Sequence, residues 1–100
     1  MSKDRIELAH QTAERLRAAA RTALNQYPGA SLLQISTPDH STIVIDRLAL
    51  AWGNLTVVSK NPETNLFQNT MFDLAYPPVM DRDIERLELL TAAVVASLDG

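Results

Sequence analysis

Apolar residues recur at alternating steps of three and four along the first quarter of the chain. The recurring positions are Ile6, Ala9, Ala13, Leu16, Ala20, Ala23 and Tyr27. This spacing is typical of an amphipathic helix, which we expect to cover residues 2–27 and to end at Pro28-Gly29. Because alanine dominates the apolar face, the helix buries little area per residue and needs a partner surface.

The pattern changes between residues 31 and 60, where short runs of Leu, Ile, Val and Thr alternate with turn residues. Residues 32–35 and 42–46 are predicted strands, joined by a turn at residues 37–40, where Pro38 has the backbone angle that a type I turn requires.

Residues 48–59 predict a tight hairpin whose two-residue loop is Gly53-Asn54. In that register Trp52 lies on the face with the larger side chains, which we expect to pack against the helices. The face with the smaller side chains is then open to solvent or to another subunit.

The last third of the chain begins with a turn at residues 61–64. The apolar spacing between residues 66 and 74 favours a short helix, although the sequence leaves open whether residues 64–76 are helix or strand. Pro77-Pro78 predicts an extended link. A final helix begins at about Asp81, and its predicted apolar face is formed by Ile84, Leu87, Leu90, Thr91, Val94, Val95 and Leu98.

These elements predict a single α+β domain over residues 1–100. It has a long N-terminal helix, a three- or four-stranded antiparallel sheet and a C-terminal helix, with both helices packed on one sheet face. The first 30 residues carry a net positive charge, and the final helix carries a net negative charge. Opposite charge favours packing of the two helices, within the chain or across a dimer.

The composition narrows the class of protein. Hydrophobic residues make up 46% and charged residues 21% of the chain, which is the balance of a folded globular domain. The sequence contains no cysteine, which excludes disulfides, thiol nucleophiles and thiolate metal sites and fits a reducing compartment. We expect a cytoplasmic protein, because neither an export signal nor a membrane-spanning segment is visible in the sequence.

The cluster Asp39-His40-Ser41 has the residue types of a hydrolase, with Ser41 as nucleophile and His40 as its base. Known triads assemble from distant parts of a fold, and neighbours on one turn rarely reach the required geometry. We interpret the cluster as a polar turn that bonds local backbone groups.

Metal and nucleotide chemistry find little support in the sequence. His10 and Glu14 are one helical turn apart, but the chain offers only one further histidine to complete a zinc site. The acids at 81, 83 and 85 lack the glycine and the terminal glutamate of a calcium loop. The three glycines of the chain do not form a phosphate-binding loop. We therefore predict neither a metal nor a cofactor.

Nucleic acid is also disfavoured as a partner. The net charge is −3, and the basic residues of the first helix do not form a coherent row. These basic residues are Arg5, Arg15, Arg17 and Arg21.

The predicted function is that of a non-catalytic interaction or regulatory module that self-associates as a homodimer and can bind a protein partner. The alternative is a small-molecule-binding protein or minor enzyme whose pocket lies near Asp46, Arg47 and Trp52. The absence of a catalytic constellation favours the first hypothesis, and no membrane interaction is expected.

Overall fold

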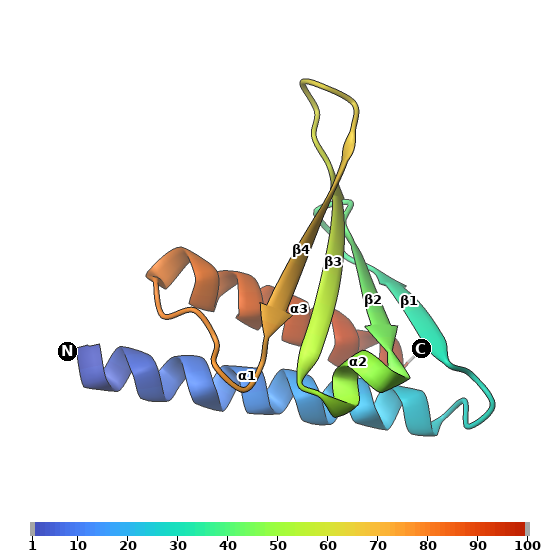
Figure 1. Cartoon of the computed structure of the whole chain (residues 1–100), viewed down its shortest axis with the longest axis horizontal. Helices are drawn as coiled ribbons and strands as arrows, with labels where there is room; N and C mark the ends of the chain where they lie inside the picture. The colour runs from blue at the N-terminus through green and yellow to red at the C-terminus, as the bar shows by residue number, and fades with distance from the viewer. Residues whose placement is uncertain (1, 100) are drawn as a thin grey trace.

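The computed structural model of the chain describes residues 2–99, with their side chains from residue 4 onward. The elements follow the order α1 (Ser2–Asn25), β1 (Leu32–Ser36), β2 (Thr42–Asp46), α2 (Arg47–Ala51), β3 (Asn54–Lys60), β4 (Phe67–Asp73) and α3 (Asp81–Asp99). The strands form one antiparallel sheet in the order β1-β2-β3-β4. α1 and α3 run side by side along one face of this sheet (Figure 1), which confirms the predicted α+β arrangement.

α1 follows from the helical period of its apolar residues. Its buried residues are Ala9, Thr12, Ala13, Leu16, Ala19, Ala20, Ala23 and Leu24. Most of them are alanines, so the backbone of α1 can approach α3 and the sheet closely. Ile6 and Tyr27, at the two ends of the predicted apolar face, are exposed, and α1 ends at Asn25 rather than at Tyr27.

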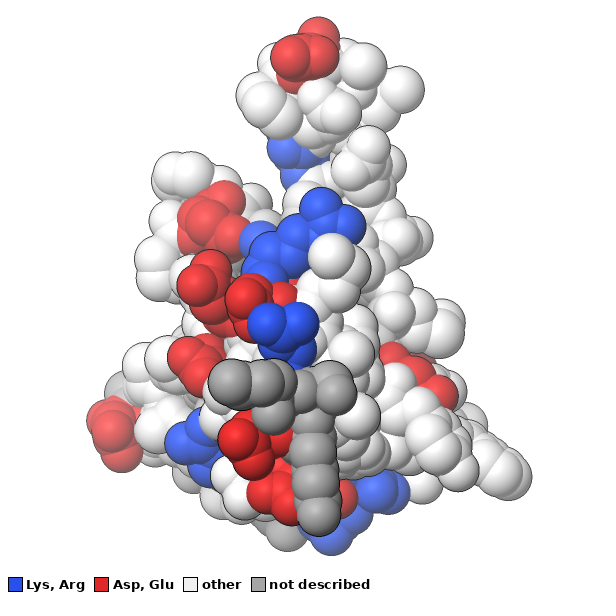
Figure 2. All heavy atoms as spheres, turned by 90° about the vertical axis from the view of Figure 1, so that its left-hand side faces the viewer, with Lys and Arg blue, Asp and Glu red and all other residues white. Residues whose placement is uncertain are grey.

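The two long helices are paired by charge at their N-terminal ends. Arg5 Nε lies 3.0 Å from Asp81 Oδ1, and both side chains are largely exposed. Charged residues gather over the helical part of the surface, whereas the side on which Figure 1 shows β3 and β4 in front is mostly uncharged (Figure 2). Among the described helices, none combines the length and the hydropathy needed to cross a bilayer.

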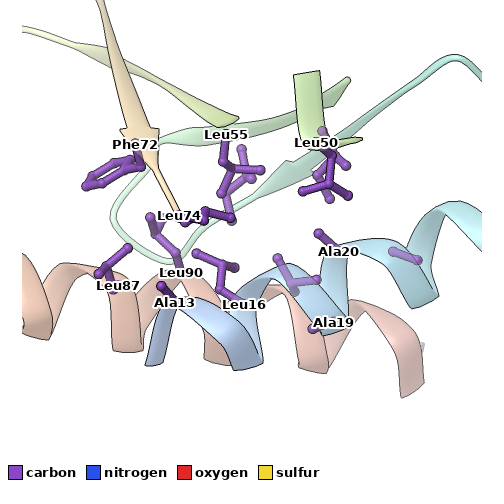
Figure 3. Packing of buried hydrophobic residues seen from close by; sticks show 14 of the residues in the cluster. Ala13, Leu16, Ala19, Ala20, Leu50, Leu55, Phe72, Leu74, Leu87 and Leu90 are labelled. Carbon is purple, nitrogen blue, oxygen red and sulfur yellow. The ribbon is translucent and has the colours of Figure 1, made fainter. Parts of the chain in front are cut away.

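The core lies between the helices and the inner face of the sheet. Alternate strand residues point into it, and the fully or nearly buried ones are Ile43, Ile45, Leu55, Val57 and Phe72. From the helices, Leu16, Leu87 and Leu90 point toward these strands (Figure 3). One apolar cluster therefore joins both helices to the sheet.

The predicted hairpin at Gly53-Asn54 is wrong. β2 ends at Asp46, whose carboxylate accepts hydrogen bonds from the amides of Leu48 and Ala49 and so caps the short helix α2. The residues that follow are leucine and alanine, which favour helix, and the cap overrides their strand-like alternation. Gly53, at φ +85°, ends this turn and leads into β3.

Trp52 consequently does not lie on the core face of a strand. It follows α2 as the C-terminal cap, and 81% of its surface is exposed. The expectation that the Trp52 face of a hairpin would pack against the helices is therefore wrong. Leu50, two residues earlier, is the α2 residue that enters the core.

The short helix favoured between residues 66 and 74 is also wrong, because this segment forms β4. Its register with β3 runs without interruption from Asn54 opposite Asp73 to Lys60 opposite Phe67. Only Phe72 of β4 is buried, so the helical spacing of apolar residues in this segment did not mark a buried face.

Candidate functional site

The three residues predicted to line a ligand pocket lie around α2, but the structure gives them different roles. Asp46 caps the helix. Arg47 donates from Nε to the carbonyl oxygen of Ala30 at 3.0 Å, and from Nη2 to those of Leu24 and Tyr27, both at 3.2 Å. Arg47 thereby binds carbonyls at and beyond the C-terminal end of α1. Trp52 projects into solvent.

Of these three residues, Arg47 lines a cleft. The cleft lies between α1 and α2 and has a volume of about 310 Å³. Its lining residues are Arg17, Arg21, Leu24, Asn25, Arg47, Leu50 and Ala51. Three guanidinium groups and no carboxylate therefore face this space.

Arg17 is the least satisfied of these arginines. One of its Nη atoms donates to the carbonyl oxygen of Ala51 at 3.4 Å, but its Nε is buried and has no hydrogen-bond partner among the described residues. A buried donor without a partner is rare in folded proteins and often marks a site for water or an ion. The cleft can therefore accept a small anion.

The sequence does not predict this cleft, because in the sequence Arg17 and Arg21 are only candidate residues of a nucleic-acid surface on the first helix. The four-residue spacing of Arg17 and Arg21 does place them on one face of α1. Nothing in the sequence shows that α2 exists and brings Arg47 to the same place.

A second polar cluster joins the β1–β2 turn to α3. Arg86 donates from Nη1 to Asp39 Oδ2 at 2.7 Å and from Nη2 to Ser41 Oγ at 3.2 Å. Ser41 Oγ lies 3.0 Å from Ser59 Oγ on β3. The Thr37 hydroxyl donates a hydrogen bond to Asp39. The cluster anchors the turn to the helix.

The electrostatics of this cluster do not suit nucleophilic catalysis. The hydrogen bond from Thr37, the charge of Arg86 and the bonds from Ser41 together lower the pKa of the Asp39 carboxyl. Asp39 is therefore held as a weakly basic carboxylate. The Ser41 hydroxyl lies beside the Arg86 guanidinium, which cannot accept a proton, and the Ser59 hydroxyl, which is a weak base. His40 occupies the exposed turn at φ 65°.

The outer face of the sheet, opposite the helices, carries no charge at its centre. The register places Gln34, Val44, Thr56 and Met71 in one row across the four strands. The neighbouring row consists of Ser36, Thr42, Val58 and Asn69. We call these eight residues the outer grid. No helix covers it in the described part of the chain.

Exposed apolar residues lie at the end of the sheet next to α2. Leu48 and Trp52 are four residues apart on α2 and are 77% and 81% exposed. Tyr76 is also 81% exposed, in the segment that approaches α2 where the amide of Leu74 donates to the carbonyl oxygen of Gly53 at 2.7 Å. Large exposed apolar groups beside an uncharged face are typical of interaction surfaces.

No protein-family model, curated protein or solved structure matches this chain.

Proposed function

We propose that the protein is a non-catalytic interaction module that works as a homodimer. The observation that supports this proposal most strongly is the outer grid, a sheet face of eight uncharged residues that no helix covers in residues 4–99. Antiparallel sheets often expose one face to solvent. Charged side chains are normally found among the polar residues of such a face. A cytoplasmic location is part of the proposal and is supported by the cysteine-free sequence.

Charge limits where two copies can meet. The chain has a net charge of −3, so identical charged surfaces of two copies repel each other. A two-fold interface brings the same patch of both copies together, which a neutral patch permits without like-charge contacts. The sheet meets this requirement both at the outer grid and along β4, whose only charged residue is Asp73.

The first test is the mass of the protein in solution. Light scattering coupled to size exclusion should give about twice the 11.0 kDa of one chain, with a shift toward the single-chain mass on dilution. A mass of 11.0 kDa at every concentration from micromolar to millimolar would contradict the homodimer.

The cleft between α1 and α2 supports a second candidate function, the binding of a small phosphate or carboxylate anion. Three arginines line it without a carboxylate, and the buried Arg17 Nε lacks a partner among the described residues. Guanidinium groups bind such oxyanions through charge-assisted hydrogen bonds. Arg21, for which no hydrogen bond is seen in the described residues, is free to contribute one.

This second candidate predicts saturable binding of inorganic phosphate. In an NMR titration the amides of α2 and of the last turns of α1 should shift, and Arg21→Gln should weaken binding about tenfold. Arg15→Gln is the matched control, because Arg15 lies on the same helix outside the cleft. If phosphate shifts no cleft amide at millimolar concentration, or if both variants behave alike, the cleft is not an anion site.

A further inference from the structure

β4 is an edge strand without the usual protection. It is the last strand of the sheet, and its seven residues pair with β3 without a bulge. It contains no proline and no lysine, and Asp73 at its end is its only charged residue. Natural sheets usually block such edges with lysine, proline, bulges or short strands, because a free edge pairs readily with another strand. The opposite edge strand, β1, has only five residues.

Two hydrogen bonds identify the backbone groups that β4 leaves free. The amide of Leu74 donates to the carbonyl oxygen of Gly53 at 2.7 Å. The amide of Asn61 donates to the carbonyl oxygen of Leu66 at 2.8 Å. Hydrogen-bonded pairs alternate along an antiparallel ladder, so the even-numbered residues of β4 face β3. The outward N–H and C=O groups belong to Phe67, Asn69, Met71 and Asp73.

We propose that β4 pairs antiparallel with β4 of a second copy about a two-fold axis at Thr70, which joins the two sheets into one. This inference rests on the proposed homodimer and specifies how it forms. In this register Phe67 lies opposite the partner's Asp73, and Asn69 lies opposite the partner's Met71. Every outward N–H and C=O of β4 then has a partner. If the two-fold axis lay one residue further along β4, the pairing would shift by two residues, and the outward groups at one end of the strand would have no partner in the partner's β4.

Charge complementarity selects the same register. The ammonium group of Lys60, on β3, lies over the Phe67 ring, 5.8 Å from its centroid. Phe67 and Asp73 both point to the outer side of the sheet, so the pairing places the partner's Asp73 directly opposite Phe67, where the long Lys60 side chain reaches toward it across the ring. The two-fold axis forms this pair of opposite charges twice. Opposite charges that meet across an interface favour one register and disfavour others.

The register also covers exposed apolar side chains. The β3–β4 hairpin projects from the rest of the fold (Figure 1). Leu66 closes its loop by accepting a hydrogen bond from the amide of Asn61, and 67% of its surface is exposed. Continued beyond β4, the pairing brings Leu66 to the partner's Leu74 and near the partner's exposed Tyr76. Burial of this surface adds a hydrophobic contribution at both ends of the paired strands. The two outer grids then form one continuous uncharged face.

The decisive variant is Asn69→Pro. Proline lacks the outward N–H and places its ring at the free edge, but it leaves the bonds from β4 to β3 intact, because Asn69 does not face β3. We expect a far-UV circular dichroism spectrum like that of the parent and a dissociation constant raised at least about 100-fold, measured by analytical ultracentrifugation. Asn69→Ala keeps the N–H and is the matched control, with dimerisation close to that of the parent.

Lys60→Glu tests the register independently of the proline. It places like charges next to each other twice in the dimer, so we expect a dissociation constant raised about tenfold, with Lys60→Gln between Lys60→Glu and the parent. This pair of variants decides the question if Asn69→Pro does not fold.

The outcomes distinguish failure of the homodimer itself from failure of the β4 pairing that is proposed to form it. A parent chain that is monomeric at all concentrations overturns both the homodimer and the pairing. A dimeric parent together with a folded Asn69→Pro variant that dimerises equally tightly overturns the β4 pairing alone and leaves the homodimer to another surface. Unchanged dimerisation of Lys60→Glu overturns the Thr70-centred register.

Discussion

Replacement of Leu16 by alanine is expected to lower the free energy of unfolding by about 3 kcal/mol. Leu16 is fully buried and points from α1 toward the sheet, beside Leu90 of α3 (Figure 3). Most of its neighbours on the same face of α1 are alanines, which cannot fill the space that the substitution leaves. The loss therefore combines the transfer free energy of the removed methyl and methylene groups with the cost of a cavity.

Urea denaturation followed by circular dichroism measures this loss, with all variants at one protein concentration because association adds to stability. Leu8→Ala is the matched control, since Leu8 lies on the same helix with 41% of its surface exposed. It should cost less than about 1 kcal/mol. Equal losses for the two variants would show that the apolar face of α1 is not buried as described.

Replacement of Arg47 by methionine is expected to cost about 2 kcal/mol of unfolding free energy. The guanidinium binds the carbonyl oxygens of Leu24, Tyr27 and Ala30, so it holds the end of α1 and the following segment against α2. Methionine keeps most of the apolar stem but leaves these partly buried carbonyls without their donor.

Arg21→Met is the control for this prediction. Arg21 lines the same cleft, but no hydrogen bond is seen for it among the described residues, so its loss should change stability by less than about 0.5 kcal/mol. The same denaturation experiment compares the two variants. If they are equally stable, Arg47 does not hold the end of α1, and its place in the cleft is better explained by ligand binding.

The sequence predicted the parts of the fold that are set by long regular periods. Both terminal helices, the strand at residues 42–46 and the turn near Pro38 follow from local spacing and turn chemistry, and the structure confirms them. Their buried residues repeat with the period of the element that contains them. In such segments local preference and tertiary packing agree.

The segments after β2 could not be predicted in the same way. The alternation from Leu48 to Trp52 fits a strand, whereas the helix propensity of leucine and alanine and the cap that Asp46 provides to the amides of Leu48 and Ala49 favour helix. β4 has one buried residue, Phe72, so its register comes from pairing with β3 and not from its own pattern. Strand pairing depends on residues distant in sequence.

The candidate sites were only partly predictable for the same reason. Arg47 was identified as a candidate, but its companions Arg17 and Arg21 come from α1 and meet it only because α2 folds against that helix. The outer grid depends on the register of four strands, and the free edge depends on the strand order. The sequence predicted an open face on part of the sheet, but neither the four-strand register of the outer grid nor the free edge of β4.

Amide hydrogen exchange along β4, measured by NMR residue by residue, tests the central claim most directly. At a concentration where the protein is dimeric, the amides of Phe67, Asn69, Met71 and Asp73 should be protected, and dilution to the monomer should remove that protection. The amides of Gln68, Thr70 and Phe72, which face β3, should stay protected under both conditions. Outward amides that exchange like those of an unstructured peptide at both concentrations would contradict the claim that β4 joins two copies.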